Sequence, residues 1–378
     1  MESTFTEVAE ITHVAEKEAQ VYVAPQWKLV WWKFRKHRMA LASAIVVILI
    51  YLVALFTEFL APFPSDQTNS KFLYAPPQTL HLFDEAGKFG LYVNGYTSKI
   101  EPVALRRVFV EDPTAKIQIG FFVEGYPYKL FGLIPASRHL VGPVDQTQTI
   151  FLLGADRLGR DLLSRLIMGT RVSMSIGLIG VGLSLVLGIL LGGLSGYYGG
   201  TVDTLIQRMI EFLRSIPSIP LWMGLAAALP LSWPPLQVYF AITIILSLIG
   251  WTSLARVVRG RFLSLREEDF IMSARLDGQS ELGIILTQML PAFTSHIIAS
   301  ITLAIPGMIL SETALSFLGL GLREPVVSWG VLLQDAQEIR AIATAPWLLI
   351  PALAVVLAVL ALNFLGDGLR DAADPYAR

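Results

Sequence analysis

The sequence predicts an all-α membrane protein with six transmembrane helices and a small β-rich extracytoplasmic insert. Hydrophobic residues make up 54% of the 378 residues and charged residues only 16%, whereas about 25% charged is usual for a soluble domain. The apolar residues fall into long runs that can cross a hydrocarbon core of ~30 Å as helices. Between the first two runs lies a stretch, residues 62–151, that is rich in proline and in short alternating patterns. Together these observations exclude an ordinary soluble domain.

The amino-terminal segment, residues 1–38, is predicted to be cytoplasmic and to lead into a first transmembrane helix at 39–61. Residues 1–25 are polar, and the run at 39–61 is longer than the 7–15 apolar residues of a secretory signal, so it is read as an uncleaved anchor. A basic cluster directly precedes this run: Lys28, Lys33, Arg35, Lys36 and Arg38.

Five further transmembrane helices are expected within residues 152–378. Their apolar runs are 172–195, 205–231, 236–255, 289–310 and 341–366. The run at 205–231 is the weakest, because prolines interrupt it and charged residues precede it. The run at 172–195 and the residue after it carry a small residue at every fourth position, which lets membrane helices pack closely. These are Gly180, Ser184, Gly188, Gly192 and Gly196.

Basic residues predict the orientation, because Lys and Arg collect in short cytoplasmic loops. The loop after the fourth span holds Arg256, Arg259, Arg261 and Arg266, and Arg370 and Arg378 end the chain. Both termini and residues 256–288 are therefore expected in the cytoplasm and the insert outside. Four arginines run against this rule, since they would lie outside with only Asp156 and Asp161 to offset them: Arg157, Arg160, Arg165 and Arg171.

The insert at 62–151 is predicted to fold as a small β module. Runs such as residues 116–124 alternate apolar and polar side chains, which is typical of strands. Its aromatic residues are too many for a disordered segment.

No catalytic, metal or cofactor site is predicted. The chain lacks the G-x-x-x-x-G-K-[ST] phosphate loop, so it is not expected to hydrolyse ATP. It has no cysteine, and its five histidines show no metal-ligand spacing. The net charge of −1 gives no reason to expect a nucleic-acid partner. Glu58, Glu211 and Glu312 are expected near helix ends within reach of water, so no proton relay is predicted.

The loop between the fourth and fifth spans has a helix–turn–helix pattern. Acidic residues at 267–269 open a short helix, Gly278 ends it, and a second helix runs through Pro291 into the fifth span. A rigid helix tied to membrane helices on both sides could transmit the movement of a partner, but it could equally be a charged connector. The residues alone leave both open.

This loop resembles the coupling segment of ABC-transporter permeases, whose pattern is E-A-A, three residues, G, nine residues, I-x-L-P. The spacing is kept, although three of the matching positions, Met272, Ser273 and Gln288, depart from the pattern. The other matching positions are Ala274, Gly278, Leu290 and Pro291. The stretches 153–166, 196–203, 315–322 and 328–330 resemble the dipeptide and oligopeptide branch of the family. The resemblance covers residues 27–65 and 151–378, and the insert is longer than the loop that is usual in this branch.

The resemblance implies a type I ABC importer permease in the cytoplasmic (inner) membrane that moves di- and oligopeptides by alternating access. It implies a homologous second permease, two ATP-binding cassette ATPases and an extracytoplasmic solute-binding protein as partners, with membrane lipid around the helices. The insert is expected to touch the binding protein or the second permease. Oligosaccharides and nickel complexes are alternative cargoes. An ion-coupled secondary transporter is the alternative class, but the repeat halves typical of that class are not found.

The resemblance also implies which residues couple the chain to an ATPase, all of them within residues 267–281. Ala274 is expected on the docking face, and Gly278 at a turn that needs a positive φ. The predicted coupling residues are Glu267, Asp269, Ser273, Ala274, Arg275, Asp277, Gly278 and Glu281.

Overall fold

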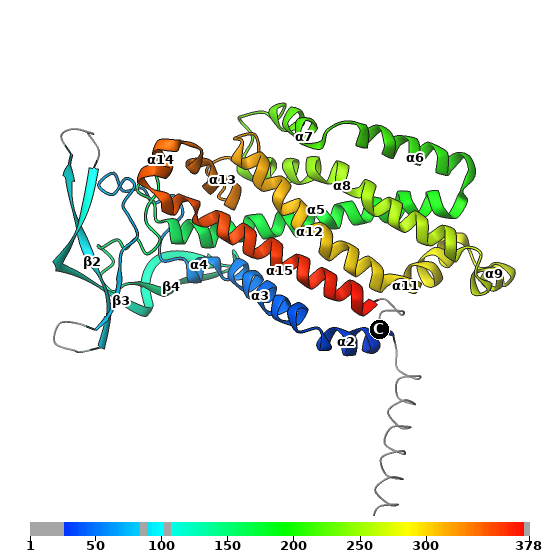
Figure 1. The fold of residues 1–378 in the computed structure, drawn as a ribbon, viewed down its shortest axis with the longest axis horizontal. Coiled ribbons are helices and arrows are strands. Elements are labelled where there is room, and N and C mark those ends of the chain that lie inside the picture. The colour runs from blue at the N-terminus through cyan, green and yellow to red at the C-terminus, as the bar shows by residue number, and fades with distance from the viewer. Residues whose placement is uncertain (1–25, 84–88, 102–106, 374–378) are drawn as a thin grey trace, which may run out of the picture.

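The computed structural model describes residues 26–83, 89–101 and 107–373. The predictions for residues 1–25 and for Arg378 lie outside the described residues. Most of the described chain is helical, and the long helices lie along one another in an elongated bundle (Figure 1).

The helices of the amino-terminal half and the centre are α2 (Gln26–Lys36), α3 (Arg38–Leu55), α4 (Thr57–Leu60), α5 (Leu162–Tyr198), α6 (Gly200–Ser215), α7 (Ser218–Ala227) and α8 (Pro235–Leu265). Those that follow are α9 (Asp269–Leu276), α10 (Glu281–Ile284), the π-helix η1 (Ile285–Met289), α11 (Leu290–Ala292) and α12 (Thr294–Phe317). The last are α13 (Trp329–Gln334), η2 (Asp335–Gln337), α14 (Ile339–Thr344), η3 (Pro346–Leu349) and α15 (Ile350–Ala373).

Five helical segments of the described chain are long and apolar enough to cross a membrane. They are Arg38–Leu55, Leu162–Tyr198, Pro235–Leu265, His296–Phe317 and Pro346–Ala373. These segments correspond to the first, second, fourth, fifth and sixth predicted spans. On α3 the exposed side chains are large and apolar, as expected of a surface in contact with lipid; they include Ile45, Ile48, Leu49, Leu52 and Leu55.

The predicted third span, residues 205–231, is wrong as a single helix. The structure divides it into α6, which ends at Ser215, and α7, which begins at Ser218. Pro217 lies between them and has no N–H to continue the helical hydrogen bonds. With 16 residues, α6 is only about 24 Å long. The α6–α7 segment nevertheless runs back along α8 (Figure 1). The part of the chain that connects the end of α5 to the start of α8 therefore passes once along the bundle.

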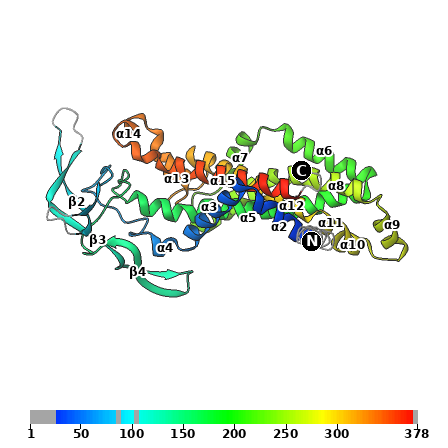
Figure 2. The ribbon, with the colours of Figure 1, turned by 60° about the horizontal axis from the view of Figure 1, so that its bottom comes forward.

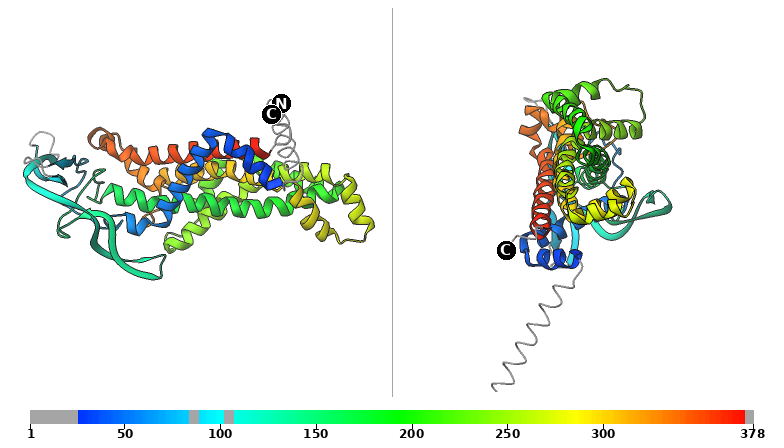
Figure 3. Two further views of the ribbon diagram at one scale, coloured as in Figure 1. Left: turned by 90° about the horizontal axis from the view of Figure 1, so that it is seen from below. Right: turned by 90° about the vertical axis from the view of Figure 1, so that its right-hand side faces the viewer.

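The centre of the bundle is α5, which contacts α3, α8 and α12 (Figure 3). Its partners are joined in turn, because α15 packs against both α12 and α3. One continuous apolar core runs through these helices and includes Met174, Leu246, Ile309, Trp329 and Leu362. The first and last described helices also meet, since Phe34, Ala40 and Ala372 form a small cluster where α2 and α3 pack against α15.

The prediction of a β-rich insert is confirmed. Four antiparallel strands pair in the order β1-β2-β3-β4. They are β1 (Leu80–Phe83), β2 (Phe89–Ile100), β3 (Arg107–Leu130) and β4 (Ile134–Pro143). The register of β2 against β3 shifts after Asn94, opposite Pro113, which cannot donate a ladder hydrogen bond. Phe63, Val93, Ile119 and Ile150 close a small core beneath the sheet.

The sheet and the α9–α11 segment occupy opposite ends of the molecule (Figures 1 and 2). The sheet end also holds α13 and α14. The other end holds α9 and α10, and the described amino-terminal helix α2 lies beside α15, between the middle of the molecule and that end (Figure 2). The two ends therefore offer two separate candidate sites.

Candidate functional site

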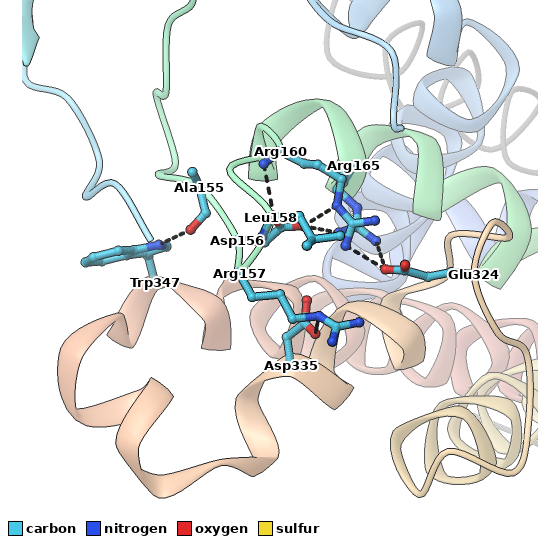
Figure 4. Close-up of polar contacts among 9 residues, drawn as sticks. All are labelled: Ala155, Asp156, Arg157, Leu158, Arg160, Arg165, Glu324, Asp335 and Trp347. Carbon is cyan, nitrogen blue, oxygen red and sulfur yellow. Dashed lines mark hydrogen bonds and ion pairs between the residues drawn. The ribbon is translucent and has the colours of Figure 1, made fainter. Parts of the chain in front are cut away.

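At the sheet end, four charged side chains form a compact ionic cluster: Asp156, Arg160, Arg165 and Glu324 (Figure 4). Arg160 Nε lies 2.6 Å from Asp156 Oδ2, and its Nη2 lies 2.6 Å from Glu324 Oε1. Arg165 pairs with the same two carboxylates, and its Nη2 lies 3.0 Å from Glu324 Oε1. The side chains of Asp156 and Arg165 are each only 1% exposed. The cluster thus ties the loop before α5 to the loop after α12.

The loop before α5 is shaped to hold this cluster. Asp156 Oδ1 accepts hydrogen bonds from the backbone N–H groups of Leu158 and Arg160, at 2.8 and 3.0 Å, and so closes a turn. Gly159 has a φ of 70°, and a Cβ there would lie 2.8 Å from the carbonyl carbon of Asn69. The turn therefore folds tightly against the segment that precedes the sheet.

Two carboxyl groups in this region have shifted pKa values. The hydrogen bond from Arg160, together with the charges of both guanidinium groups, lowers the pKa of Glu324 to about 2 although burial opposes this. Burial raises the pKa of Asp161 to about 6. Asp161 caps α5, since its Oδ2 accepts from Ser164 N at 2.8 Å and from Ser164 Oγ at 2.6 Å.

The four arginines that contradict the charge rule are all paired in the structure. Besides the cluster, Arg157 Nε lies 3.0 Å from Asp335 Oδ1, and Arg171 pairs with Glu58. Trp347 Nε1 donates to Ala155 O at 2.9 Å beside them (Figure 4). The partners Glu324 and Asp335 could not be predicted from the sequence because they lie more than 150 residues away along the chain.

The expectation that Glu312 reaches water is wrong. Its side chain is fully buried, and its Oε1 accepts hydrogen bonds from Ser316 Oγ at 2.7 Å and Ser328 Oγ at 2.6 Å. Ser328 also caps α13, which folds over Glu312 and packs on α12 and α5. Trp329 N donates to Ser173 Oγ at 3.0 Å. The stretches 315–322 and 328–330 are therefore joined through one buried carboxyl group.

At the opposite end, the predicted coupling segment forms two short helices joined by a turn. The first is α9 and the second is α10, which Ser280 caps by accepting from Gly283 N at 3.2 Å. Gly278 lies between them with a φ of 75°, the left-handed conformation that the turn was predicted to need.

Ala274 was predicted to lie on the docking face, and in the structure its side chain packs inward. Ala274 is buried against its own chain, in a cluster with Phe262, Ile271 and Ile284. The reason is helical spacing: Ile271 and Ala274 are three residues apart and share the inward face of α9. Met272 and Leu276, which are four residues apart on the outward face, are 48% and 88% exposed, and Phe270 at the side of the helix is 43% exposed. The remaining predicted coupling residues are all exposed, and they are Glu267, Asp269, Ser273, Arg275, Asp277, Gly278 and Glu281.

The carboxyl end of α5 holds the coupling segment in place. The Arg275 guanidinium lies 5.2 Å from the centre of the Tyr197 ring, and Tyr198 OH donates to Glu281 Oε2 at 2.6 Å. Just beyond, Asp203 accepts two hydrogen bonds of 2.5 Å from Arg259 on α8. Two of the predicted coupling charges, Arg275 and Glu281, are thus already engaged within the chain.

The small residues of α5 face its neighbours. A Cβ added at Gly192 would lie 2.8 Å from Ala255 Cα, and one added at Gly196 would lie 2.6 Å from Phe262 Cβ. Ser184 Oγ donates to the carbonyl of Ser247 at 3.4 Å. Gly188 meets α8 in the same way, and Gly180 meets Met308 on α12.

Comparison with known families and proteins agrees with this arrangement. The family model for the binding-protein-dependent transport system inner membrane component matches residues 185–378, just over half of the chain. The model for the N-terminal TM domain of oligopeptide transport permease C matches residues 25–77. Residues 78–184, which include all four strands, lie in neither match.

Several curated proteins are similar to about 60% of this chain. The oligopeptide transport system permease protein OppC of Haemophilus influenzae is 41% identical over 226 residues, 60% of this chain and 70% of that protein. The dipeptide transport system permease protein DppC of Alkalihalophilus pseudofirmus is 39% identical, covering 59% of this chain and 71% of that protein. The glutathione transport system permease protein GsiD of Pectobacterium atrosepticum is 40% identical, covering 59% and 72%.

The helical bundle, the coupling segment and these matches lead to one assignment. The chain belongs to the family of inner membrane components of binding-protein-dependent transport systems, and it is a multi-pass ABC-transporter permease subunit rather than an ATPase.

Proposed function

We propose that this chain and a homologous second permease together form the translocation path of an ATP-driven importer for di- and oligopeptides. The names of its relatives support peptides as the cargo, because they specify oligopeptides, dipeptides and glutathione, itself a peptide. Oligosaccharides and nickel complexes are the alternative cargoes, and the names of these relatives specify neither.

Two ATPase subunits dock at the α9 end and a solute-binding protein delivers cargo at the sheet end. The basic residues at 256–266 and at 28–38 support a cytoplasmic location for the α9 end and for both termini. In this arrangement α6 and α7 together make the third of six crossings. Arg208, Glu211 and Arg214 on α6 then lie toward the cytoplasmic end, where water can solvate them.

The observation that carries the coupling role is the exposed apolar face of α9. Leu276 and Met272 project from the end of the bundle, and Phe270 is exposed at the side of the same helix, which is fixed from behind by Ile271 and Ala274. An exposed apolar patch with charged neighbours is typical of a protein-binding surface. The charges at the rim, such as Asp269 and Asp277, contribute orientation more than affinity.

Movement of the ATPases then reaches the membrane helices through this segment. Because Tyr197 contacts Arg275 on α9 and Tyr198 bonds Glu281 on α10, a displacement of the coupling segment moves α5. The small residues of α5, with Gly192 and Gly196 at closest approach, keep α5 and α8 in contact so that both move together. The alternation between inward-open and outward-open forms is a rigid rearrangement of this kind.

The test is a pair of substitutions at Gly278. Gly278→Val places a β-branched residue at a φ of 75° and distorts the turn, whereas Gly278→Asn tolerates this conformation and serves as the matched control. Open space surrounds Gly278, so neither variant creates a clash. We expect Gly278→Val to assemble in the membrane but to lose uptake, and Gly278→Asn to retain most of it.

Both variants are compared in proteoliposomes that contain the assembled transporter. Peptide uptake and the stimulation of ATP hydrolysis by loaded binding protein are measured side by side. Normal uptake by Gly278→Val would show that the segment is only a connector. Equal loss in both variants would show that the turn conformation is not the property that matters.

A further inference from the structure

The hairpin between β3 and β4 ends in an apolar tip, residues 128–136. Leu130 pairs with Ile134, and Phe131, Gly132 and Leu133 form the turn. The side chains of Phe131, Leu133 and Ile134 are 46%, 82% and 57% exposed. Three large apolar side chains at the end of one hairpin are costly in water, because exposed apolar surface is unfavourable in proportion to its area.

The tip does not point away from the bundle. The hairpin turns back from the sheet and lies beside α4 (Figures 2 and 3). The ring of Phe131 meets the ring of Phe56 edge-to-face at 5.6 Å between centroids. Further along β3, the ring of Phe122 lies 6.1 Å from that of Phe59. The tip is thus held at the point where α3 ends.

This point is the level at which α3 leaves the hydrocarbon core. Arg171 donates to the terminal carbonyl of Ala54 at 2.9 Å and pairs with Glu58, so charged groups lie one turn beyond the span. The exposed apolar side chains of α3 continue to this level through Leu52 and Leu55. The apolar surface of the tip is therefore continuous with the lipid-facing surface of α3.

The residues of the tip suit an interface between lipid and water rather than bulk water. Phe131 has a φ of 54° and Gly132 of 72°, a turn in which Asn or Gly would normally precede the glycine. A bulky residue such as phenylalanine rarely adopts this conformation, so its presence here has a conformational cost. Lys129 is exposed beside it and can meet anionic headgroups. Aromatic side chains are enriched at this depth of the bilayer.

We propose that the tip of the β3–β4 hairpin inserts into the interfacial layer of the bilayer that α3 crosses, and that lipid is the partner of its exposed apolar side chains. Leu133 and Ile134 enter the acyl boundary, and Phe131 lies between them and Phe56. The contact anchors the insert at a fixed height above the helices. It does not depend on which solute the transporter carries.

The experiment uses site-directed spin labelling of this chain, which has no natural cysteine and is labelled before the transporter is assembled. Labelled Leu133→Cys is measured in the assembled transporter, reconstituted in vesicles of phosphatidylethanolamine and phosphatidylglycerol. Ile48→Cys on α3 is the lipid reference and Ser98→Cys on β2 is the water reference, because both side chains are exposed in the structure. Collision rates with oxygen, which partitions into lipid, and with a neutral nickel chelate, which stays in water, give the depth.

We expect the ratio of oxygen to nickel collisions at Leu133 to exceed that at Ser98 several-fold and to fall below that at Ile48. A ratio equal to that at Ser98 would place the tip in water and overturn the proposal. Low collision rates with both reagents would show that a protein surface covers the tip, such as the second permease or the binding protein, and would overturn it as well. Because Leu133 is largely exposed, its replacement leaves the packing of the hairpin intact.

Discussion

Substituting Asp156 by asparagine isolates the electrostatic part of the ionic cluster. Asparagine keeps the side-chain oxygen that accepts from the backbone of Leu158 and Arg160, so the turn retains its hydrogen bonds. It removes the charge that balances Arg165, whose side chain is only 1% exposed. The cluster then holds two cations, Arg160 and Arg165, and one anion, Glu324.

The magnitude follows from the burial of Arg165. Removing one partner of a buried ion pair typically costs about 3–5 kcal/mol, because a charge is left uncompensated in a medium of low polarity. The loss is local, since the cluster joins the loops around residues 69–75, 154–161 and 323–325. A free-energy loss of this size speeds the exchange of the amides in these loops by about two to three and a half orders of magnitude.

Amide hydrogen exchange on the assembled transporter measures this loss directly. The informative amides are those of Tyr74, which donates to Asp156 O, and Ala155, which donates to Ala75 O. The matched control is Arg208→Met, because Arg208 is 76% exposed in its pair with Glu211 and such a pair contributes only about 0.2–1 kcal/mol. We expect the control to change exchange less than about tenfold anywhere.

The double variant Asp156→Asn/Arg165→Met tests the cause. It leaves Arg160 and Glu324 as one cation and one anion, still 2.6 Å apart, and removes the uncompensated guanidinium. Exchange in the double variant should therefore be slower than in Asp156→Asn alone. Exchange in Asp156→Asn no faster than in Arg208→Met, or a double variant at least as fast as the single one, would refute the reasoning.

Three further predictions concern packing, pH and docking. Gly192→Ala forces α5 away from Ala255 and should destabilise the subunit by about 1–3 kcal/mol in denaturant titration, whereas Gly182→Ala, with open space around it, should not destabilise it. The pKa of Glu324 is lowered from 4.5 to about 2, so its stabilising contribution is present above pH 4.5 and is lost as the pH falls toward 2. The difference in loop exchange between wild type and Glu324→Gln should shrink over that window, and a constant difference would contradict the pairing. Leu276→Glu should release the ATPase subunits on co-purification, whereas Leu231→Glu at the other end, 83% exposed, should retain them.

The bundle was largely predictable because membrane spans are determined by local composition. A run of about 20 apolar residues must be helical in lipid, whatever its neighbours are. The prediction of a single helix failed at the third span, because Pro217 interrupts it and divides it into α6 and α7. The β-rich insert was predictable in class, because alternation is also a local signal, but the backward turn of the hairpin toward α3 was not.

The sites were only partly predictable because their partners are distant in sequence. The turn at Gly278 follows from one residue type, and the structure gives it a positive φ. The burial of Ala274 depends on Phe262 and Ile284, which come from two other helices. The burial of Glu312 was not predicted for the same reason. The sequence shows that Glu312 is near the end of α12, but not that Ser328 and α13 fold over its side chain.

One helix joins the two ends of the molecule. With 37 residues, α5 is about 55 Å long and reaches from its cap at Asp161, beside the ionic cluster, to Tyr198, which bonds Glu281 in the coupling segment. The stripe of small residues along it excludes the loose packing that would let α8 slide independently. In the proposed mechanism, a displacement at α9 therefore appears at the sheet end as a movement of the whole α5–α8 pair. The ionic cluster, which ties the start of α5 to Glu324, then carries this movement to the loop after α12.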